Sequence, residues 1–426
     1  MWKKILINFF RLVLALTLIF SGFVKAIDPK GTQYKLQEYL AALHLEAGSA
    51  EAVVLVIAVF LAAIEFCLGI FLLFAIRRRL VSSLTLALMI VMTLVTCWVY
   101  IAHPVSDCGC FGDAIKLSPG GTLLKNIGLT ICAAAVATMP KSMIRFISEM
   151  NQWIVSYYTA LFIFTCSLMS LYYLPIFDFR PYKIGANIKE GMKIPEGAEL
   201  PEFETTFILE KNDEQKEFTI DNYPDSTWTF VDSKTTLKKE GYVPPIHDFS
   251  ISLEGVDITE DILDNPGYTF LLISPHLEHA DDTNFGDINQ VYEYARTNNY
   301  IFLCLTASSK GAIEHWKEYT GAEYVFASTD ETTLKTIIRS NPGMLLLKNG
   351  TIIRKWAIAN LPDINADTLP LHQVEIGKQP EGSTPRKILK IILWYILPLL
   401  LLTIADRAWA WTRWLKEKKR LTKQSK

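Results

Sequence analysis

The sequence shows no clear leader-cleavage site and has few cysteines. The first apolar run, at about 5–24, carries Asn8 and Arg11, and no clear cleavage site of small residues follows it. These features are not those expected of a secretory signal peptide, so we expect a retained helix. Only seven of the 426 residues are cysteine, and the formal net charge is −2. Because the chain has no strong basic excess, we expect no nucleic-acid partner.

Charge is scarce in six stretches of the chain. Half of all residues are hydrophobic, and many of them gather in runs long enough to cross a lipid bilayer. The runs lie at about 5–24, 52–74, 80–101, 123–139, 153–174 and 388–404. Between the last two, about two hundred residues contain no such run. The sequence therefore predicts six transmembrane helices with a large soluble part between the fifth and the sixth.

Basic residues predict how the helices are oriented. They cluster before the first helix (Lys3, Lys4), between the second and third (77–79), between the fourth and fifth (Lys141, Arg145) and after the last (412–426). Short basic loops stay in the cytoplasm. We therefore expect a protein of the bacterial inner membrane with both termini on the cytoplasmic side. The loops at 28–51 and 103–121 and the large soluble part are expected in the periplasm.

Two of the seven cysteines lie in the polar loop at 103–121, whereas the other five lie in apolar runs. Cys108 and Cys110 are separated only by Gly109, which permits a tight turn. Disulfides form and persist in extracytoplasmic compartments. A bond across so short a loop would be strained and therefore oxidising. It would add little stability, because little chain entropy is lost when such a loop closes.

Three interpretations of Cys108 and Cys110 remain open. Redox exchange fits the short loop, and His103 is a candidate proton acceptor nearby. Asp107 and Asp113 argue against it, because carboxylates disfavour a neighbouring thiolate. The alternatives are a purely structural turn and a zinc site that adds His103 to the two cysteines. The zinc site lacks a convincing fourth ligand.

Two charged residues fall inside predicted membrane helices. Glu65 lies near the middle of the second helix, where a carboxylate is costly unless it is paired or faces a cavity. Counting from the cytoplasmic ends places Glu65 about 16 Å deep and Arg11 about 9 Å deep, so Arg11 is its natural partner. Arg11 could instead extend to the inner interface. Whether Glu65 is structural or belongs to a cofactor or proton site stays open.

The soluble part divides into two units. Residues 176–245 contain alternating polar and apolar segments between turn residues, which predicts β structure. From residue 246 onward, buried strands such as 266–274 alternate with helices such as 286–298. A hairpin turning at Asn349–Gly350 closes the series. This order predicts a mixed sheet covered on both faces.

The second unit resembles the thioredoxin fold. The stretch "NPGMLLLKNGTIIRKW" is similar to its C-terminal half, and "HDFSISLEGVDITEDIL" to the lead-in of TlpA-type relatives. The resemblance covers about 246–361 and implies that Pro342 follows a cis peptide bond. The place of the fold's Cys-x-x-Cys motif reads "SPHLEHADD", however, with His276, Glu278 and His279.

The thiolate is the nucleophile of disulfide exchange, so this unit is expected to be redox-inactive and to bind a client or partner. The His276–His279 stretch fits the start of a surface helix, with a metal site as the alternative.

The membrane part resembles the MauE branch of the DoxX-like membrane protein family. The resemblance rests on "RLVLALTLIFSGFVKAIDP", "AAIEFCLG" and "DCGCFGDAIKLSPGGTLLKN", and it covers about the first 140 residues. It implies a four-helix bundle associated with the maturation of disulfide-rich periplasmic proteins. Such bundles are often compared with quinone-linked disulfide oxidases, so a membrane quinone is the candidate acceptor. The sequence itself contains no quinone motif.

The expected fold class is a multi-pass α-helical membrane protein of six helices, with an extracytoplasmic β-rich segment and an α/β thioredoxin-like domain. The expected units are a membrane bundle (1–145), a fifth helix (150–175), the β-rich segment (176–245), the thioredoxin-like domain (246–370), a last helix (386–411) and a basic tail (412–426).

We expect Cys108 and Cys110 to exchange disulfides with an extracytoplasmic protein client and to pass electrons to an acceptor near Glu65. The alternative is a non-enzymatic envelope scaffold, in which the two cysteines form a fixed turn and the soluble domain docks other proteins.

Overall fold

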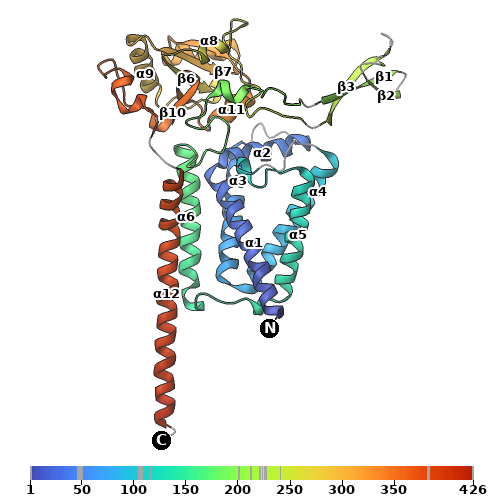
Figure 1. The fold of residues 1–426 in the computed structure, drawn as a ribbon, viewed down its shortest axis with the longest axis vertical. Helices are drawn as coiled ribbons and strands as arrows, with labels where there is room; N and C mark the ends of the chain where they lie inside the picture. The colour runs from blue at the N-terminus through green and yellow to red at the C-terminus, as the bar shows by residue number, and fades with distance from the viewer. Residues whose placement is uncertain are drawn as a thin grey trace.

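A computed structural model describes residues 2–45, 51–103, 109–115, 117–199, 202–211, 214–219, 222, 224, 228–239, 241–380 and 384–424. Figure 1 shows a bundle of long helices with a soluble domain at one end and both termini toward the other. We call residues 173–199 and 241–380 the soluble domain, and the strands between 202 and 239 the β arm.

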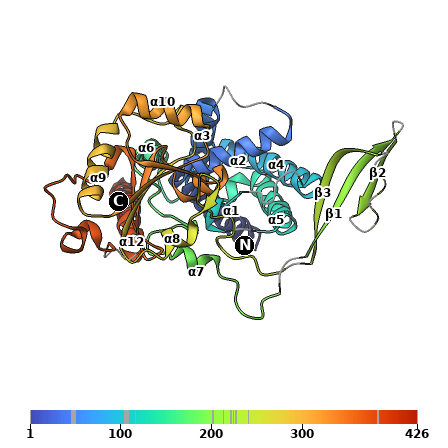
Figure 2. The same ribbon diagram turned by 90° about the horizontal axis from the view of Figure 1, so that it is seen from above.

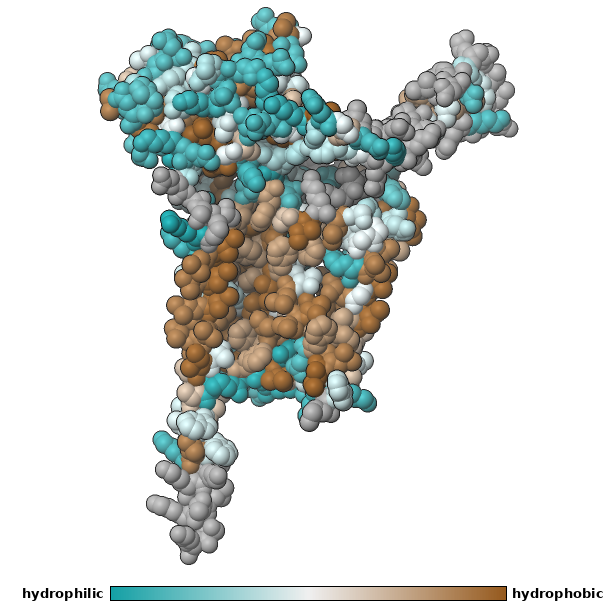
Figure 3. All heavy atoms as spheres, in the orientation of Figure 1, coloured by the Kyte–Doolittle hydropathy of each residue, from teal (hydrophilic) through white to brown (hydrophobic). Residues whose placement is uncertain are grey.

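Within the described residues, six helices are long and apolar enough to cross a membrane, as the sequence predicts. They are α1 (Trp2–Ile27), α3 (Glu51–Phe74), α4 (Arg78–Ala102), α5 (Pro119–Thr138), α6 (Gln152–Tyr172) and α12 (Thr384–Gln424). Their outward side chains form an apolar belt between two polar ends (Figure 3). The protein is a multi-pass helical membrane protein that carries a soluble domain.

A further helix, α2 (Pro29–Ala42), lies across the end of the bundle beneath the soluble domain (Figure 1). The expectation of a loop at 28–51 was therefore wrong over most of that range. The local start signals are strong, because Asp28 caps the helix by accepting a hydrogen bond from Gly31 N at 2.9 Å and Pro29 occupies the first turn. The mixed composition of α2 gives no clear apolar period, which is why the helix was missed.

The helices that lead into and out of the soluble domain pack against each other. The rings of Tyr158 on α6 and Tyr395 on α12 stack with centroids 5.6 Å apart, and Thr159 Oγ1 lies 2.8 Å from the Tyr395 hydroxyl. Nearer the termini, Asp406 on α12 accepts hydrogen bonds from Ser148 N at 2.8 Å and Asn151 Nδ2 at 2.7 Å. The soluble domain is thus attached at two neighbouring points.

The soluble domain is built on a seven-stranded mixed sheet of order β10-β9-β6-β7-β8-β4-β5. β6, β7 and β8 are parallel, and β9, β10, β4 and β5 run antiparallel to their neighbours. The strands are β4 (Ser252–Leu253), β5 (Val256–Asp257), β6 (Tyr268–Ser274), β7 (Ile301–Thr306), β8 (Val325–Ser328), β9 (Gly343–Lys348) and β10 (Thr351–Ala357).

Helices cover both faces of this sheet, as predicted. One face packs against α7 (Ile188–Met192), α8 (Thr259–Leu263) and α11 (Glu331–Ile337), and the other against α9 (Phe285–Thr297) and α10 (Lys310–Thr320). The β9–β10 hairpin turns at Asn349–Gly350, and the Asn341–Pro342 peptide bond is cis. Both predictions are confirmed. Cys304 lies in the sheet core, where burial raises the pKa of its thiol and keeps it unreactive.

The β arm is a separate antiparallel sheet that projects sideways from the soluble domain (Figure 2). Its strands are β1 (Glu202–Lys211), β2 (Glu214–Thr219) and β3 (Thr229–Lys239), in the order β2-β1-β3. The β structure predicted for 176–245 is therefore concentrated in the arm.

Candidate functional site

Two glycines bring α1 and α3 into close contact and fix how they align. A Cβ atom at Gly22 would lie 2.4 Å from Phe66 N, and one at Gly69 would lie 2.7 Å from Ile19 N. Only glycine permits such an approach of two backbones, and small residues are the usual means of close helix packing in membranes. This alignment sets residues 21–25 of α1 opposite Glu65 of α3.

A buried group of three polar side chains results. Lys25 Nζ donates to Glu65 Oε1 at 2.6 Å, to Glu65 Oε2 at 2.8 Å and to Ser21 Oγ at 3.2 Å. These contacts use all three donors of the ammonium group. The Glu65 side chain is 2% exposed and the Lys25 side chain 4%. We call Ser21, Lys25 and Glu65 the buried triad.

The expected pairing of Glu65 with Arg11 was wrong. Arg11 lies in the N-terminal half of α1, where its Nη1 donates to the carbonyl oxygen of Ile144 at 2.6 Å and its guanidinium lies 5.3 Å from the Phe146 ring. Counting depth from the cytoplasmic helix ends assumed that α1 and α3 are level at that surface. The glycine contacts set a different alignment, and Lys25 takes the place assigned to Arg11.

The loop that carries Cys110 contacts the buried triad through its backbone. The Ser21 hydroxyl lies 2.7 Å from Glu65 Oε2 and 2.8 Å from the carbonyl oxygen of Cys110. A hydroxyl has one proton, so it donates to one of these oxygens at a time. Cys110 is only 7% exposed. Irregular backbone within a membrane bundle is tolerated where protein buries it or where it lines a cavity.

Glycine makes the turn of this loop possible. Gly109 has a φ of +59°, in the left-handed region. A Cβ atom there would also lie 2.8 Å from the Lys35 side chain on α2. The turn is closed by a hydrogen bond from Gly112 N to the Gly109 carbonyl oxygen at 3.0 Å. Phe111 then packs edge-on against Phe20, with ring centroids 5.4 Å apart.

The other candidate residues from the sequence either make common surface or ring contacts or lie outside the residues that the structure describes. Cys108 and Asp107 are outside the described residues. His103 ends α4 with a φ of +48° and its ring lies 6.2 Å from that of Tyr100. In the soluble domain, His276 Nε2 lies 2.9 Å from Glu331 Oε1, and Glu278 accepts from the Ser308 hydroxyl at 2.7 Å.

Within the described part of the chain, no group of three or more His, Cys, Asp or Glu side chains is placed to hold a metal ion. His279 ends the short 3-10 turn at Leu277–His279, with its ring 6.4 Å from that of His276.

One arginine of the soluble domain reaches the bundle beside the cysteine loop. Arg339 Nε lies 3.0 and 3.1 Å from the two Asp28 oxygens, and its Nη2 lies 2.9 Å from Asp28 Oδ2 and 3.2 Å from Asp113 Oδ2. Asp28 ends α1 and caps α2, whereas Asp113 follows Cys110 in the loop. A Cβ atom on Gly31 would lie 2.8 Å from Arg339 Nη2, so the glycine leaves room for this contact.

The contact is a pair of ionised groups. Burial opposes ionisation of the Asp28 carboxyl, but the Arg339 guanidinium and a hydrogen bond from Gly31 N hold its pKa below the usual value. Burial likewise lowers the pKa of Arg339, but the carboxylate of Asp28 outweighs this and raises it. The Arg339 side chain is 7% exposed. Such charge-assisted, bidentate bonds are the strong ones in proteins.

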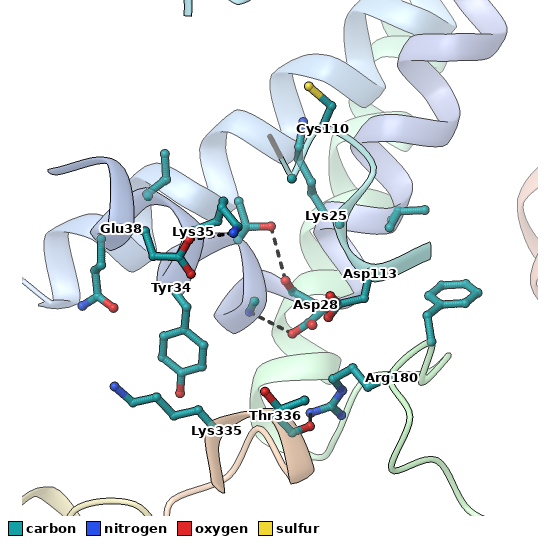
Figure 4. A pocket seen from close by; sticks show the side chains of 18 of the residues that line it. Lys25, Asp28, Tyr34, Lys35, Glu38, Cys110, Asp113, Arg180, Lys335 and Thr336 are labelled. Carbon is teal, nitrogen blue, oxygen red and sulfur yellow. Dashed lines mark hydrogen bonds and ion pairs between the residues drawn. The ribbon is translucent and has the colours of Figure 1, made fainter. Parts of the chain in front are cut away.

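A cavity of about 970 Å³ lies between the bundle and the soluble domain. Figure 4 shows Asp28 and Asp113 next to each other below Cys110 and Lys25, and Tyr34 of α2 facing Lys335 of α11. The cavity is thus lined by the cysteine loop and α2 on one side and by α11 on the other.

This cavity also has an apolar part. It is lined by Leu61 of α3 and by Leu88, Val91, Met92 and Val95 of α4. Val91 is 55% exposed. The lining of the cavity therefore combines polar groups, at Lys25 and Cys110, with apolar side chains of the membrane helices α3 and α4. A ligand with a polar head and an apolar tail fits this arrangement.

The fold and the site together define a multi-pass membrane protein whose bundle holds a buried ion pair and a cysteine loop. A family model described as "Methylamine utilisation protein MauE" matches residues 3–139, which contain α1 to α5. The N-terminal region of the chain is therefore similar to MauE. A model described as "Domain of unknown function (DUF8463)" matches residues 203–240, the β arm.

Comparison with whole proteins adds little. No curated protein matches the chain. Among solved structures, the "Solution structure of a putative protein disulfide isomerase from Bacteroides thetaiotaomicron" is similar at 13% sequence identity. The match covers 26% of this chain and 76% of that chain, with a TM-score of 0.22.

Sequence reasoning missed Lys25, Ser21 and Arg339. Lys25 carried a usable signal, because it is a charged residue at the end of an apolar run, four residues after Ser21 and three before Asp28 in "SGFVKAIDP". Arg339 carried none, since it is 311 residues from Asp28 and looks like any charged residue that follows a short helix.

Proposed function

We propose that the protein is a membrane thiol–disulfide oxidoreductase that oxidises extracytoplasmic protein thiols through Cys108 and Cys110. The observation that carries the proposal is the hydrogen bond of the Ser21 hydroxyl, which joins the Cys110 backbone to the Lys25–Glu65 ion pair. A loop needed only as a turn has no reason to be held against a buried charge pair, which is costly to keep inside a membrane.

The reaction has two halves that balance. In the first, two thiols of a client reduce the Cys108–Cys110 disulfide, so that the client gains a disulfide and the loop holds two thiols. In the second, the loop gives up two electrons and two protons to a lipid-soluble two-electron oxidant of the quinone class, and its disulfide forms again. Exchange proceeds by attack of a thiolate on a disulfide sulfur.

The cavity supports a lipid-soluble oxidant as the second substrate. Its apolar lining at Leu88, Val91 and Met92 suits an isoprenoid tail, and its polar lining at Lys25 suits the head group. In this proposal Lys25 exchanges its hydrogen bond to Ser21 for one to the head group, and Glu65 accepts protons released from the loop. Intramembrane ionisable residues commonly have such roles.

The soluble domain is proposed to lie in the periplasm of a bacterium, with both chain termini in the cytoplasm, because the basic clusters then share the cytoplasmic side. Cys304, its one cysteine, is fully buried in the sheet. The domain therefore contributes contacts with clients rather than thiol chemistry.

The test uses the purified full-length protein in lipid nanodiscs, a reduced dithiol peptide and a short-chain quinone. We expect thiol loss and quinol formation to proceed one to one. Cys108→Ser and Cys110→Ser should each abolish both, whereas Cys304→Ser, in the remote sheet core, should retain them. Turnover that survives Cys110→Ser would refute the proposed chemistry.

A non-enzymatic scaffold is the second candidate, and the β arm favours it because the arm projects away from the rest of the soluble domain (Figure 1). If the scaffold is correct, Cys108 and Cys110 should keep one redox state in cells grown under oxidising and reducing conditions. Thiol labelling of the two cysteines under both conditions separates the candidates.

A further inference from the structure

The bundle and the soluble domain have separate hydrophobic cores. Among the described residues, four clusters contain most of the buried apolar side chains, and each cluster lies in one part: two in the soluble domain and two in the membrane bundle. The aromatic contact between Phe23 and Phe177, at 6.4 Å, involves the segment that leaves α6 rather than the sheet. Domains that do not share a core are expected to move relative to each other.

Polar contacts hold the two parts together. Arg339 binds Asp28 and Asp113, as described above. The Arg339 guanidinium also lies 5.3 Å from the centroid of the Tyr34 ring on α2, and Lys335 Nζ lies 5.2 Å from it. We call these contacts of Arg339 and Lys335 with Asp28, Asp113 and Tyr34 the latch. Such contacts form and break without exposing a hydrophobic core, so the latch suits a reversible interface.

The latch closes the space in front of Cys110. Cys110 lines the wall of the cavity opposite α11, and it is 7% exposed when the two parts are in contact. A cavity of about 970 Å³ admits a small molecule. It is far too small for a folded protein to bring a cysteine to Cys110, because even a drug-sized ligand fills such a pocket.

We propose that the soluble domain is a reversible cover over Cys110, held shut by the latch, which must open before a protein-sized thiol can reach the loop. This inference rests on the proposed function, since it concerns access to the same loop. In the closed state small molecules would reach Cys110, whereas protein clients would reach it only after the soluble domain moves away from the bundle. Loss of the Arg339–Asp28 pair should therefore favour the open state.

The experiment compares two thiol reagents of different size on the mildly reduced full-length protein in nanodiscs. Iodoacetamide is small enough to enter the closed cavity, and a maleimide on a long polyethylene glycol chain is not. Modification of Cys110 is followed over time by mass spectrometry of its peptide. The ratio of the two rates reports access by size and cancels changes in the reactivity of the thiol.

Two single variants open the latch in different ways. Arg339→Gln removes the guanidinium, whereas Asp28→Asn removes the carboxylate but keeps a side chain that can cap α2. We expect each to raise the polymer rate at Cys110 about tenfold, equivalent to about 1.4 kcal/mol of lost docking free energy. The iodoacetamide rate should change less than twofold.

Two further variants test whether a change in the rates is due to misfolding. Arg296→Gln removes an exposed arginine of α9 that pairs with Glu293 at 2.6 Å, and it should leave the ratio unchanged. The double variant Asp28→Asn/Arg339→Gln removes both charges together and so leaves neither buried alone. Its soluble domain should open as readily as in either single variant. The double variant should also be more stable than Arg339→Gln.

The outcomes separate this inference from the proposed function. An unchanged polymer rate in both single variants and the double variant refutes the cover, as does an equal rise with both reagents, which indicates local loosening. If the ratio rises but the wild-type protein never oxidises a dithiol peptide, the cover stands and the proposed chemistry fails.

Discussion

At the scale of single residues, the Lys25–Glu65 pair is the most demanding feature of the bundle. Both side chains are almost fully buried. Their contacts at 2.6 and 2.8 Å, together with that of Lys25 to Ser21 at 3.2 Å, leave no donor of the ammonium group unused. A buried pair of this kind adds little net stability, but removing one partner leaves an uncompensated charge and costs about 3–5 kcal/mol. The pair is therefore better explained by function than by stability.

This predicts an asymmetry between single and double substitutions. Glu65→Gln and Lys25→Met should each lower the abundance and melting temperature of the protein sharply. The double variant should recover much of both, because no charge is then left alone, and yet stay inactive in peptide oxidation. Immunoblots, thermal melts in detergent and turnover measure the three quantities.

Glu149→Gln is the control for that prediction, since Glu149 pairs with Arg145 at an exposed site and should change stability by less than about 1 kcal/mol. A double variant that regains both abundance and full turnover would show that the pair is only structural.

At the scale of elements, the α1–α3 contact determines which side chains meet. A Cβ atom at Gly22 would lie 2.4 Å from Phe66 N and 2.7 Å from Ala62 O, which are backbone atoms that cannot rotate away. Gly22→Ala should therefore push the helices apart, cost about 1–3 kcal/mol and draw Ser21 and Lys25 away from Glu65. The melting temperature and the turnover rate should fall together.

Gly128 on α5 provides the comparison, because a Cβ atom there has nothing within 4 Å. Gly128→Ala should be neutral or stabilising by up to about 1 kcal/mol, as alanine favours a helix over glycine. Equal losses from the two substitutions would mean that helix propensity, rather than the close contact, accounts for the effect.

The elements themselves were largely predictable, because their signals are local. Apolar runs marked the six long helices, the apolar run at 270–273 marked the buried strand at 268–274, and Asn349–Gly350 marked the hairpin. What joins the elements was not predictable. The pairing of Lys25 with Glu65 depends on glycine contacts between helices, and that of Arg339 with Asp28 spans 311 residues. No periodicity in a single sequence records such distances.

At the scale of the whole molecule, the basic clusters and the soluble domain lie at opposite ends of the bundle. Figure 3 shows the polar head, the apolar belt and the polar opposite end in order. We predict that a protease added to inverted inner-membrane vesicles cuts the C-terminal end of α12 but spares the β arm. Protease added to spheroplasts should do the reverse. Cleavage of the arm in inverted vesicles would overturn the orientation.

The attachment of the soluble domain to the bundle at both of its ends also determines how its docking through the latch competes with client binding at the cysteine loop. The domain leaves α6 at Tyr172 and returns at Thr384 to α12, and these helices are packed together through Tyr158 and Tyr395. Its closing is therefore a first-order process, with an effective concentration of about millimolar for a short tether. A free client at micromolar concentration would have to bind the cysteine loop about a thousandfold more tightly than the domain does to displace it at equilibrium. Clients that instead bind the soluble domain first would share its tether and escape this disadvantage.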